Sequence, residues 1–361
     1  MGARGNFQLR IFAGIQAMRG VAATLVVVGH ATGFALYAGL NYGFAARAVS
    51  HVFQFGVDIF FVVSGFIIAT TVSDRIGRGA GRFAVATEFL GRRIVRIYPV
   101  YWLVLVVSVA IGPLVPMTIP PSVPAISGPT LDDLLLTGFG NILVPQAWTL
   151  VYEVIFYGVV TVFLAVAPRR LFIGLALLSL GLAAVRIRFG LAVLPGYLLF
   201  VEFFFGVAIA VLTGRGYRGL ALPAGLLAVL PVAVGGYLLD GLPVAFLDDF
   251  QRVPTFGLGA ALLIYAVVAA EQRGARFPRF LCWLGDISYS AYVWHWLVLI
   301  LLKETAVRFL PASFQMALWL GVVLGVAALS YTYLERPTLR FGRRALTLLE
   351  TPRAPQLATD A

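Results

Sequence analysis

The stretch FGVDIFFVVSGFIIA, residues 55–69, decides the fold, because Asp58 is its only charged side chain. The apolar run around it covers residues 52–72, about the 20 residues that a helix needs to cross the hydrocarbon core of a bilayer. Similar runs recur from residue 11 to residue 335 without a long polar interval. The chain of 361 residues is 60% hydrophobic and 12% charged, with a mean hydropathy of +0.93. Soluble domains are far more polar, so the sequence predicts an all-α polytopic membrane protein.

Windows of about 20 residues predict ten transmembrane helices. The predicted spans are residues 12–37, 52–72, 97–115, 142–167, 171–188, 191–212, 219–239, 254–270, 286–302 and 314–335. They form one membrane domain, residues 12–337, between an N-terminal segment, 1–11, and a C-terminal tail, 338–361. The first span is too long for the apolar region of a cleaved signal peptide, so we expect it to be retained.

The basic residues are divided unequally between the two sides of the predicted bundle. If the N-terminus is cytosolic, the cytosolic loops and both termini hold 20 of the 27 Lys and Arg residues, and Arg19 lies inside a span. The outward loops then hold only Arg47, Arg186, Arg188, Arg252, Lys303 and Arg308. The positive-inside rule therefore predicts that both termini are cytosolic. This topology explains the net charge of +11, and the scattered basic residues argue against nucleic-acid binding.

One outward loop is rich in proline. The segment Gly112–Asn141 contains six prolines and no basic residue, and it carries the acidic pair Asp132 and Asp133. Prolines stiffen a loop, and long loops often act as lids. The sequence predicts an extracytoplasmic cap or lid here.

The first predicted span contains IQAMRGVAATLVVVGH, residues 15–30, with polar side chains on one helix face. Arg19 and His30 are eleven residues apart and so differ by only about 20° around the helix, with His30 roughly 16 Å further outward. Ionisable groups inside spans are costly and usually functional. The alternative is an arginine that reaches the cytosolic interface and a hydrogen-bonded core histidine.

Two further spans carry a carboxylate. Asp58 lies about two turns inside the outer boundary of its span, with Ser64 deeper, and is a candidate either for catalysis or for a salt bridge that orients helices. Glu153, in WTLVYEVIFY, lies near the middle of the membrane and is a candidate to orient His30 for general-base chemistry. Trp148 is about 140° from Glu153 around the helix, so we expect it to be mainly structural.

A basic cluster, RRIVRIYPVYW, precedes the third predicted span on its cytosolic side. Arg93 and Arg96, and likewise Arg92 and Arg96, have the spacing of neighbours on one helix face. Adjacent guanidinium groups suit phosphates, including those of coenzyme A. The alternative is positive charge that sets topology beside an interfacial aromatic belt.

The stretch ISYSAYVWHWLVL places His295 inside the ninth predicted span among aromatic residues. Such a histidine lines a cavity or fills the bundle core, and the sequence favours neither. The motif YLERP follows at the end of the tenth span, where Glu335 and Arg336 suggest a helix-end ion pair.

These five stretches, in this order and spacing, resemble the acyltransferase 3 family of membrane O-acyltransferases from about residue 15 to residue 337. IQAMRG and WTLVYE are most similar to members that modify exopolysaccharides. The resemblance implies ten spans in a bacterial inner membrane, an acyl-CoA donor, often acetyl-CoA, and a carbohydrate hydroxyl as acceptor. The acceptor would be an exopolysaccharide, a lipopolysaccharide or a lipid-linked sugar. We expect no metal, and Cys282, as the only cysteine, excludes a thiolate cluster and an internal disulfide.

The resemblance also implies roles for residues. His30 corresponds to the essential histidine of the family, Arg19 to its first-span arginine, and Glu153 to its acidic residue after the tryptophan. Arg93 and Arg96 form its RxxR motif, and with Arg92 they are predicted to bind the phosphates of coenzyme A. His30, oriented by Glu153 or Asp58, would take a proton from the sugar hydroxyl, directly or through an acyl-histidine intermediate. Arg19 would lie near the donor or the developing charge.

His295, Trp148 and Ser64 are the candidates for substrate binding. A different class of protein would also explain buried polar groups. A transporter or flippase for lipid-linked sugars builds its path from intramembrane Arg, His and carboxylates. Its usual signs, inverted repeats and a regular pair of broken helices, are not evident in this sequence.

Overall fold

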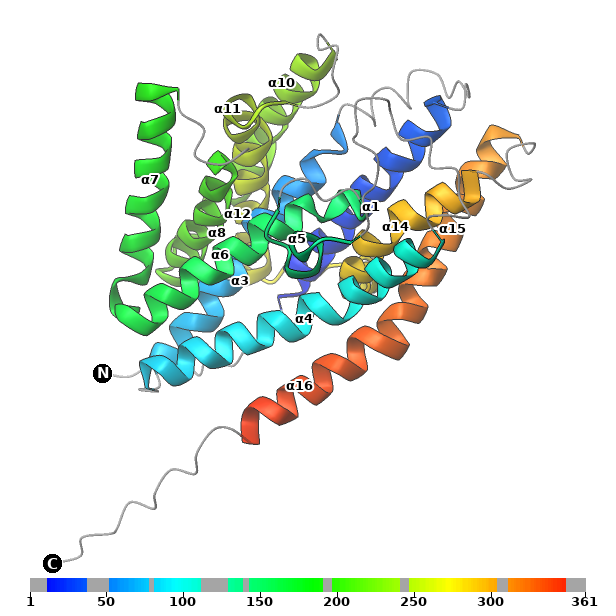
Figure 1. Cartoon of the computed structure of the whole chain (residues 1–361). Coiled ribbons are helices and arrows are strands. Elements are labelled where there is room, and N and C mark those ends of the chain that lie inside the picture. The colour runs from blue at the N-terminus through cyan, green and yellow to red at the C-terminus, as the bar shows by residue number, and fades with distance from the viewer. Residues whose placement is uncertain are drawn as a thin grey trace, which may run out of the picture.

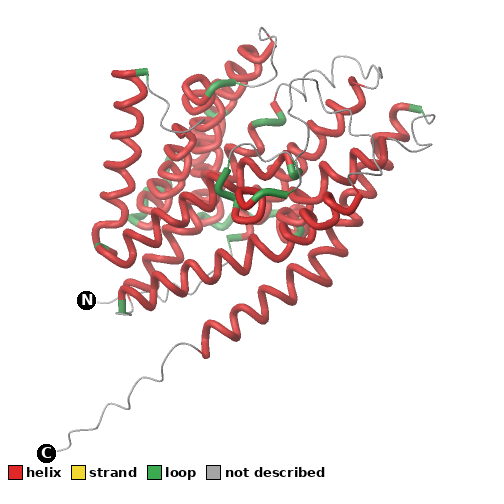
Figure 2. The backbone as a smooth tube through the Cα atoms, in the orientation of Figure 1, coloured by secondary structure: helices red, strands yellow, loops and turns green. Residues whose placement is uncertain are grey.

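The computed structural model describes residues 12–37, 52–77, 81–111, 129–138, 143–190, 197–240, 247–303 and 311–348. Within these ranges every regular element is a helix, as Figure 2 shows, which confirms the predicted fold class. Nine helical segments of the described residues are long and apolar enough to cross a membrane.

The long helices follow the predicted spans in order (Figure 1). They are α1 (Ala13–Tyr37), α3 (Phe55–Gly77), α4 (Arg82–Ile111), α6 (Trp148–Val166), α7 (Leu171–Phe189), α8 (Phe200–Gly214), α9 (Ala221–Leu227) with α10 (Val229–Asp240), α12 (Leu258–Gln272), α14 (Ser288–Lys303), and α15 (Ala312–Ser330) with α16 (Arg336–Leu348). The short helices α5 (Leu131–Leu135) and α13 (Arg279–Asp286) lie between them, whereas α11 (Asp249–Arg252) continues through the π-helical turn Val253–Gly257 into α12.

The span predicted at 286–302 is α14, which has 16 residues. At 1.5 Å per residue it is about 24 Å long, shorter than a hydrocarbon core of about 30 Å, and it is therefore not one of the nine long spans. The preceding α13 is a separate amphipathic helix that packs along α1, and Ile287 forms the bend between α13 and α14.

Helix α1 lies inside the bundle, in contact with α3, α12, α13, α14 and α15, whereas α7 stands at one edge (Figure 1). The polar face of α1 therefore points into protein. Helices α3 and α8 pack closely, since a side chain at Gly65 would meet the Phe203 carbonyl oxygen at 1.9 Å and one at Gly206 would meet the Val62 carbonyl oxygen at 2.0 Å. Small residues let membrane helices approach to this distance.

The predicted cap corresponds in part to α5. Residues 112–128 and 139–141 lie outside the described residues, whereas α5 is held against α4. The Tyr98 hydroxyl donates to the Leu135 carbonyl at 2.8 Å, the Trp102 indole donates to the Leu134 carbonyl at 2.9 Å, and the Tyr101 hydroxyl donates to the Asp133 carbonyl.

These aromatic residues precede the end of α4 at Ile111 by roughly 13–20 Å of helix. The described part of the segment thus packs beside the middle of α4 and not beyond its C-terminal end, and its role as an extracytoplasmic cap or lid stays a prediction. The physical reason is that the carbonyls of a very short helix need donors, which the side chains of α4 supply.

Candidate functional site

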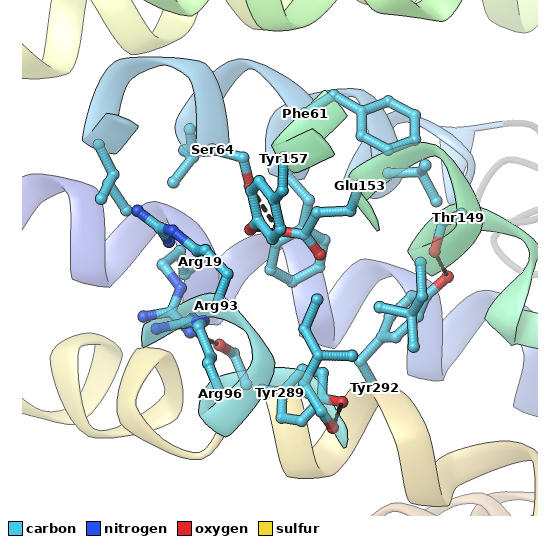
Figure 3. Close-up of a pocket in the computed structure, with 17 residues that line it drawn as sticks. Arg19, Phe61, Ser64, Arg93, Arg96, Thr149, Glu153, Tyr157, Tyr289 and Tyr292 are labelled. Atoms are coloured by element: carbon cyan, nitrogen blue, oxygen red, sulfur yellow. Dashed lines mark hydrogen bonds between the residues drawn. The ribbon is translucent and has the colours of Figure 1, made fainter. Parts of the chain in front are cut away.

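A cavity between α1, α3, α4, α6 and α14 gathers three of the predicted site arginines, Arg19, Arg93 and Arg96. Figure 3 shows the three guanidinium groups at one end of this arginine cavity, and Thr149 and Tyr292 at the other. Its other polar lining residues are Ser64, Glu153, Tyr157, Ser288 and Tyr289. Arg93 and Arg96, which were predicted to share one helix face, therefore both line this cavity, together with Arg19 of α1.

Arg19 is 7% exposed and is held by neutral partners. Its guanidinium donates to the Gln16 side-chain oxygen at 2.7 Å and to the Ser288 hydroxyl at 2.9 Å. Gln16 in turn donates to Asp286 at 2.6 Å. The Asp286 carboxylate is therefore separated from Arg19 by the side chain of Gln16. Arg19 is therefore fixed in place while its charge is not neutralised by direct contact.

Arg93 lies over the rings of Phe89 and Tyr157, at 5.3 and 5.0 Å from their centroids. Among the described residues, no carboxylate lies within ion-pair distance of Arg19, Arg93 or Arg96. A cavity with three guanidinium groups at one end and no directly paired carboxylate is suited to an anion.

Arg92 does not belong to this group. Its guanidinium forms an ion pair at 2.5 Å with Glu88, which also binds Arg75. Arg92 is absent from the described lining of the arginine cavity. The i, i+4 spacing with Arg96 was compatible with a shared site, but Glu88 one turn earlier offers Arg92 a closer partner.

Glu153 lines the arginine cavity and accepts hydrogen bonds from the Ser64 hydroxyl, at 3.1 Å, and from the Tyr157 hydroxyl. Within the described part of the chain it has no hydrogen bond to His30. The predicted contact between this carboxylate and His30 is therefore not present, because two hydroxyls from α3 and α6 hold Glu153 on the side of the arginines.

His30 is instead paired with His295. Nδ1 of His30 lies 3.1 Å from Nε2 of His295 and 3.0 Å from the carbonyl oxygen of Val26. Nδ1 of His295 lies 2.6 Å from the carbonyl oxygen of Tyr292. The rings of Phe53 and Trp296 stand edge-on to His30, at 5.1 and 5.2 Å between centroids.

The histidine pair lies next to the far end of the arginine cavity. Tyr292 lines that end, and its ring centroid is 5.7 Å from that of His295. The Tyr292 hydroxyl is held at 2.6 Å from the Thr149 hydroxyl. Tyr292 thus lies between the cavity and His295, and His295 in turn contacts His30. The sequence placed both histidines inside spans but offered no signal that they meet.

Asp58 forms a salt bridge instead of joining the histidines. It is fully buried, and its two oxygens accept from Arg252 at 2.8 and 3.0 Å. Arg252 also donates to the Gln54 carbonyl at 3.0 Å and lies 5.8 Å from the Trp148 ring centroid. Of the two roles considered for Asp58, this geometry is that of a helix-orienting salt bridge, and Trp148 covers it.

Arg252 was predicted in an outward loop, which is wrong, since it is buried in α11, within the apolar helical segment Asp249–Gln272. The helix starts earlier than the predicted span at 254, because Asp248 caps α11 and accepts from the Gln251 amide at 2.8 Å. Glu202 on α8, also fully buried, was missed entirely, and it packs against Gly257. The need of Asp58 for a cation at its own depth was the one sequence signal that pointed to Arg252.

The fold and the site define a polytopic membrane protein with a polar, arginine-lined cavity inside its helical bundle. A family model described as an acyltransferase domain matches residues 12–334 of the chain. The chain therefore belongs to the acyltransferase 3 family, and it is a membrane acyltransferase. The resemblance predicted from the five motifs is confirmed.

A curated relative, the exopolysaccharide production protein ExoZ of Rhizobium meliloti (strain 1021), is 31% identical over 321 residues. The aligned region covers 83% of this chain and 94% of the relative. No solved structure matches the chain.

Proposed function

We propose that this protein transfers an acyl group, with acetyl as the expected group, from acyl-CoA to a hydroxyl of an exopolysaccharide. Its family supplies the reaction type. The similarity to an exopolysaccharide production protein along nearly the whole relative supports the acceptor class. The donor assignment depends on one observation, the three guanidinium groups that face the arginine cavity without a directly paired carboxylate.

Coenzyme A suits that cavity because its phosphates are multiply charged and bind arginine forks well. The phosphates would contact Arg93 and Arg96, and Arg19 would contact the donor further along. The far end of the cavity, at Thr149 and Tyr292, is one side chain away from His295, so the thioester would have to pass Tyr292 to reach His30. Arg19 lies roughly 16 Å from His30 along α1, which favours a donor-binding role over contact with the reacting carbonyl.

In the proposed reaction the imidazole of His30 removes the proton from the acceptor hydroxyl as its oxygen attacks the thioester carbonyl. The new ester C–O bond forms, the C–S bond breaks, and the coenzyme A thiolate leaves. The proton held by His30 then returns to the thiolate or to solvent, which restores the base.

We also infer that both termini face the cytosol of a bacterial cell and that the protein lies in the inner membrane. The unequal division of basic residues supports this orientation, and it becomes more unequal once Arg252 is counted as buried. A C-terminal green fluorescent protein fusion should fluoresce, and a periplasm-dependent phosphatase fusion at the same point should be inactive.

The function is tested with purified protein in lipid nanodiscs, by acetyl-CoA binding and by release of free thiol in the presence of an exopolysaccharide repeat unit. Wild type should bind and turn over the donor. His30→Ala should lose about 100- to 10,000-fold in turnover, because general-base catalysis contributes that much, while donor affinity stays within twofold.

Two outcomes would contradict the proposal. Full turnover by a folded His30→Ala protein would remove His30 from the reaction. No donor binding and no thiol release by wild type would favour a transporter of lipid-linked sugars, which needs no thioester.

A further inference from the structure

The hydrogen bonds around the two histidines determine which ring nitrogen carries the proton. Nδ1 of His295 faces the carbonyl oxygen of Tyr292 at 2.6 Å. A carbonyl oxygen only accepts, so Nδ1 of His295 must be protonated. In the neutral ring, Nε2 of His295 is then an acceptor, and it points at His30 from 3.1 Å.

The same argument applies to His30. Its Nδ1 faces two acceptors, the Val26 carbonyl at 3.0 Å and Nε2 of His295 at 3.1 Å. Only a protonated Nδ1 satisfies both, so the neutral ring has its free lone pair on Nε2. An unprotonated Nδ1 would place two lone pairs and a carbonyl oxygen against one another.

We propose that His295 is a positioning residue for His30, which fixes the tautomer and ring orientation so that Nε2 of His30 presents the reactive lone pair. This inference rests on the proposed function, in which His30 is the base. His295 thereby takes the place that a carboxylate occupies beside a catalytic histidine, which neither Glu153 nor Asp58 takes in this structure.

The pair also keeps the proton transfer balanced. When Nε2 of His30 takes the proton of the acceptor hydroxyl, His30 becomes an imidazolium, and its Nδ1–H still donates to Nε2 of His295. His295 stays neutral, because its own Nδ1–H remains bonded to Tyr292. No second proton moves, and a hydrogen bond to a charged donor is stronger than one to a neutral donor.

The first test reads the tautomers without any reaction. The chain contains three histidines, so ¹⁵N-histidine labelling with His51→Gln leaves only His30 and His295 in the spectrum. Nitrogen NMR of this protein in nanodiscs at neutral pH should show both rings protonated at Nδ1, the less common neutral tautomer. A His30 ring protonated at Nε2 would overturn the proposal, whether or not the protein is an acyltransferase.

The second test compares two amide replacements of His295 that differ only in reach. Glutamine places its amide oxygen near the former Nε2 and can accept from His30, whereas asparagine reaches only the former Nδ1 position toward Tyr292. His295→Asn should lower kcat by about 10- to 100-fold with an unchanged KM for acetyl-CoA, the loss expected for one hydrogen bond to a charged group. His295→Gln should keep most of the activity.

In the same samples, the His30 signal of His295→Asn should become a mixture of tautomers, and that of His295→Gln should not. Equal activity of the two variants together with an unchanged His30 signal would overturn the positioning role. The His30→Ala variant tests the proposed function separately. If His30→Ala loses turnover and the two His295 variants do not, His30 remains the base and only the positioning role of His295 is overturned.

Discussion

Arg252 and Arg19 are both buried arginines of membrane-spanning helices, 4% and 7% exposed, and they differ in what faces them. Arg252 is held by both oxygens of Asp58 and by a backbone carbonyl. Arg19 bonds a glutamine and a serine, and it faces a cavity shared with Arg93 and Arg96. The first charge is satisfied within the protein, whereas the second is positioned but not neutralised.

The difference teaches how to read an intramembrane charge. Ionisable groups in a bilayer are costly, so each needs a partner, water or a ligand. A charge that is paired within the protein has a structural role, because its salt bridge connects two helices, here α3 and α11. Three guanidinium groups at one end of a hollow, with no directly paired carboxylate among the described residues, suit an anion as ligand.

The largest effect should come from breaking the paired site. Arg252→Met leaves Asp58 buried without its cation, and removing one partner of a buried pair costs about 3–5 kcal/mol. We expect a strongly lowered thermal unfolding midpoint in detergent. The matched control is the double variant Asp58→Leu/Arg252→Met, which removes both charges and should recover most of the stability. Equal midpoints for Arg252→Met and wild type would show that the pair contributes nothing to stability.

The unpaired site should behave in the opposite way. Arg96→Gln removes a cation of the arginine cavity and should weaken acetyl-CoA binding by about 10- to 100-fold, the loss of one charge-assisted hydrogen bond of about 1.5–3 kcal/mol. The unfolding midpoint should change much less than in Arg252→Met, because Arg96 forms no direct ion pair among the described residues. Calorimetric titration and thermal unfolding measure the two quantities.

Arg92→Gln is the control for that experiment, since Arg92 is in the same helix but pairs with Glu88 outside the cavity. Its donor affinity should equal that of wild type. If Arg92→Gln and Arg96→Gln weakened binding equally, a general loss of positive charge would explain the result, and the contrast between the two sites would fail.

The smallest effect should come from the aromatic neighbours of the two arginines. Trp148→Phe weakens the contact with Arg252 and should cost about 0.5–1 kcal/mol of stability, without a change in donor affinity. Tyr157→Phe keeps the ring beside Arg93 and should leave donor affinity within twofold. A larger effect of Trp148→Phe on donor affinity than on stability would assign Trp148 to the donor site.

The ends of the helices differ from the ends of the spans that hydropathy predicted. Helix α4 begins at Arg82, well before the predicted span at 97, because its first turns are amphipathic and are stabilised by the ion pairs of Glu88 with Arg75 and Arg92. A hydropathy window detects only the apolar part of a helix. For the same reason it did not detect α11, which contains the buried Arg252.

The sequence by itself determined the class of fold, the positions of the predicted spans, the polar face shared by Arg19 and His30, and the spacing of Arg93 and Arg96. These properties follow from hydropathy and from the 3.6-residue period of a single helix, which neighbouring residues set. Only the tertiary structure decided which groups meet. His30 and His295 are 265 residues apart, and Asp58 and Arg252 are 194 apart. Such pairs depend on the depth and rotation of one helix against another, which close packing such as that at Gly65 and Gly206 sets.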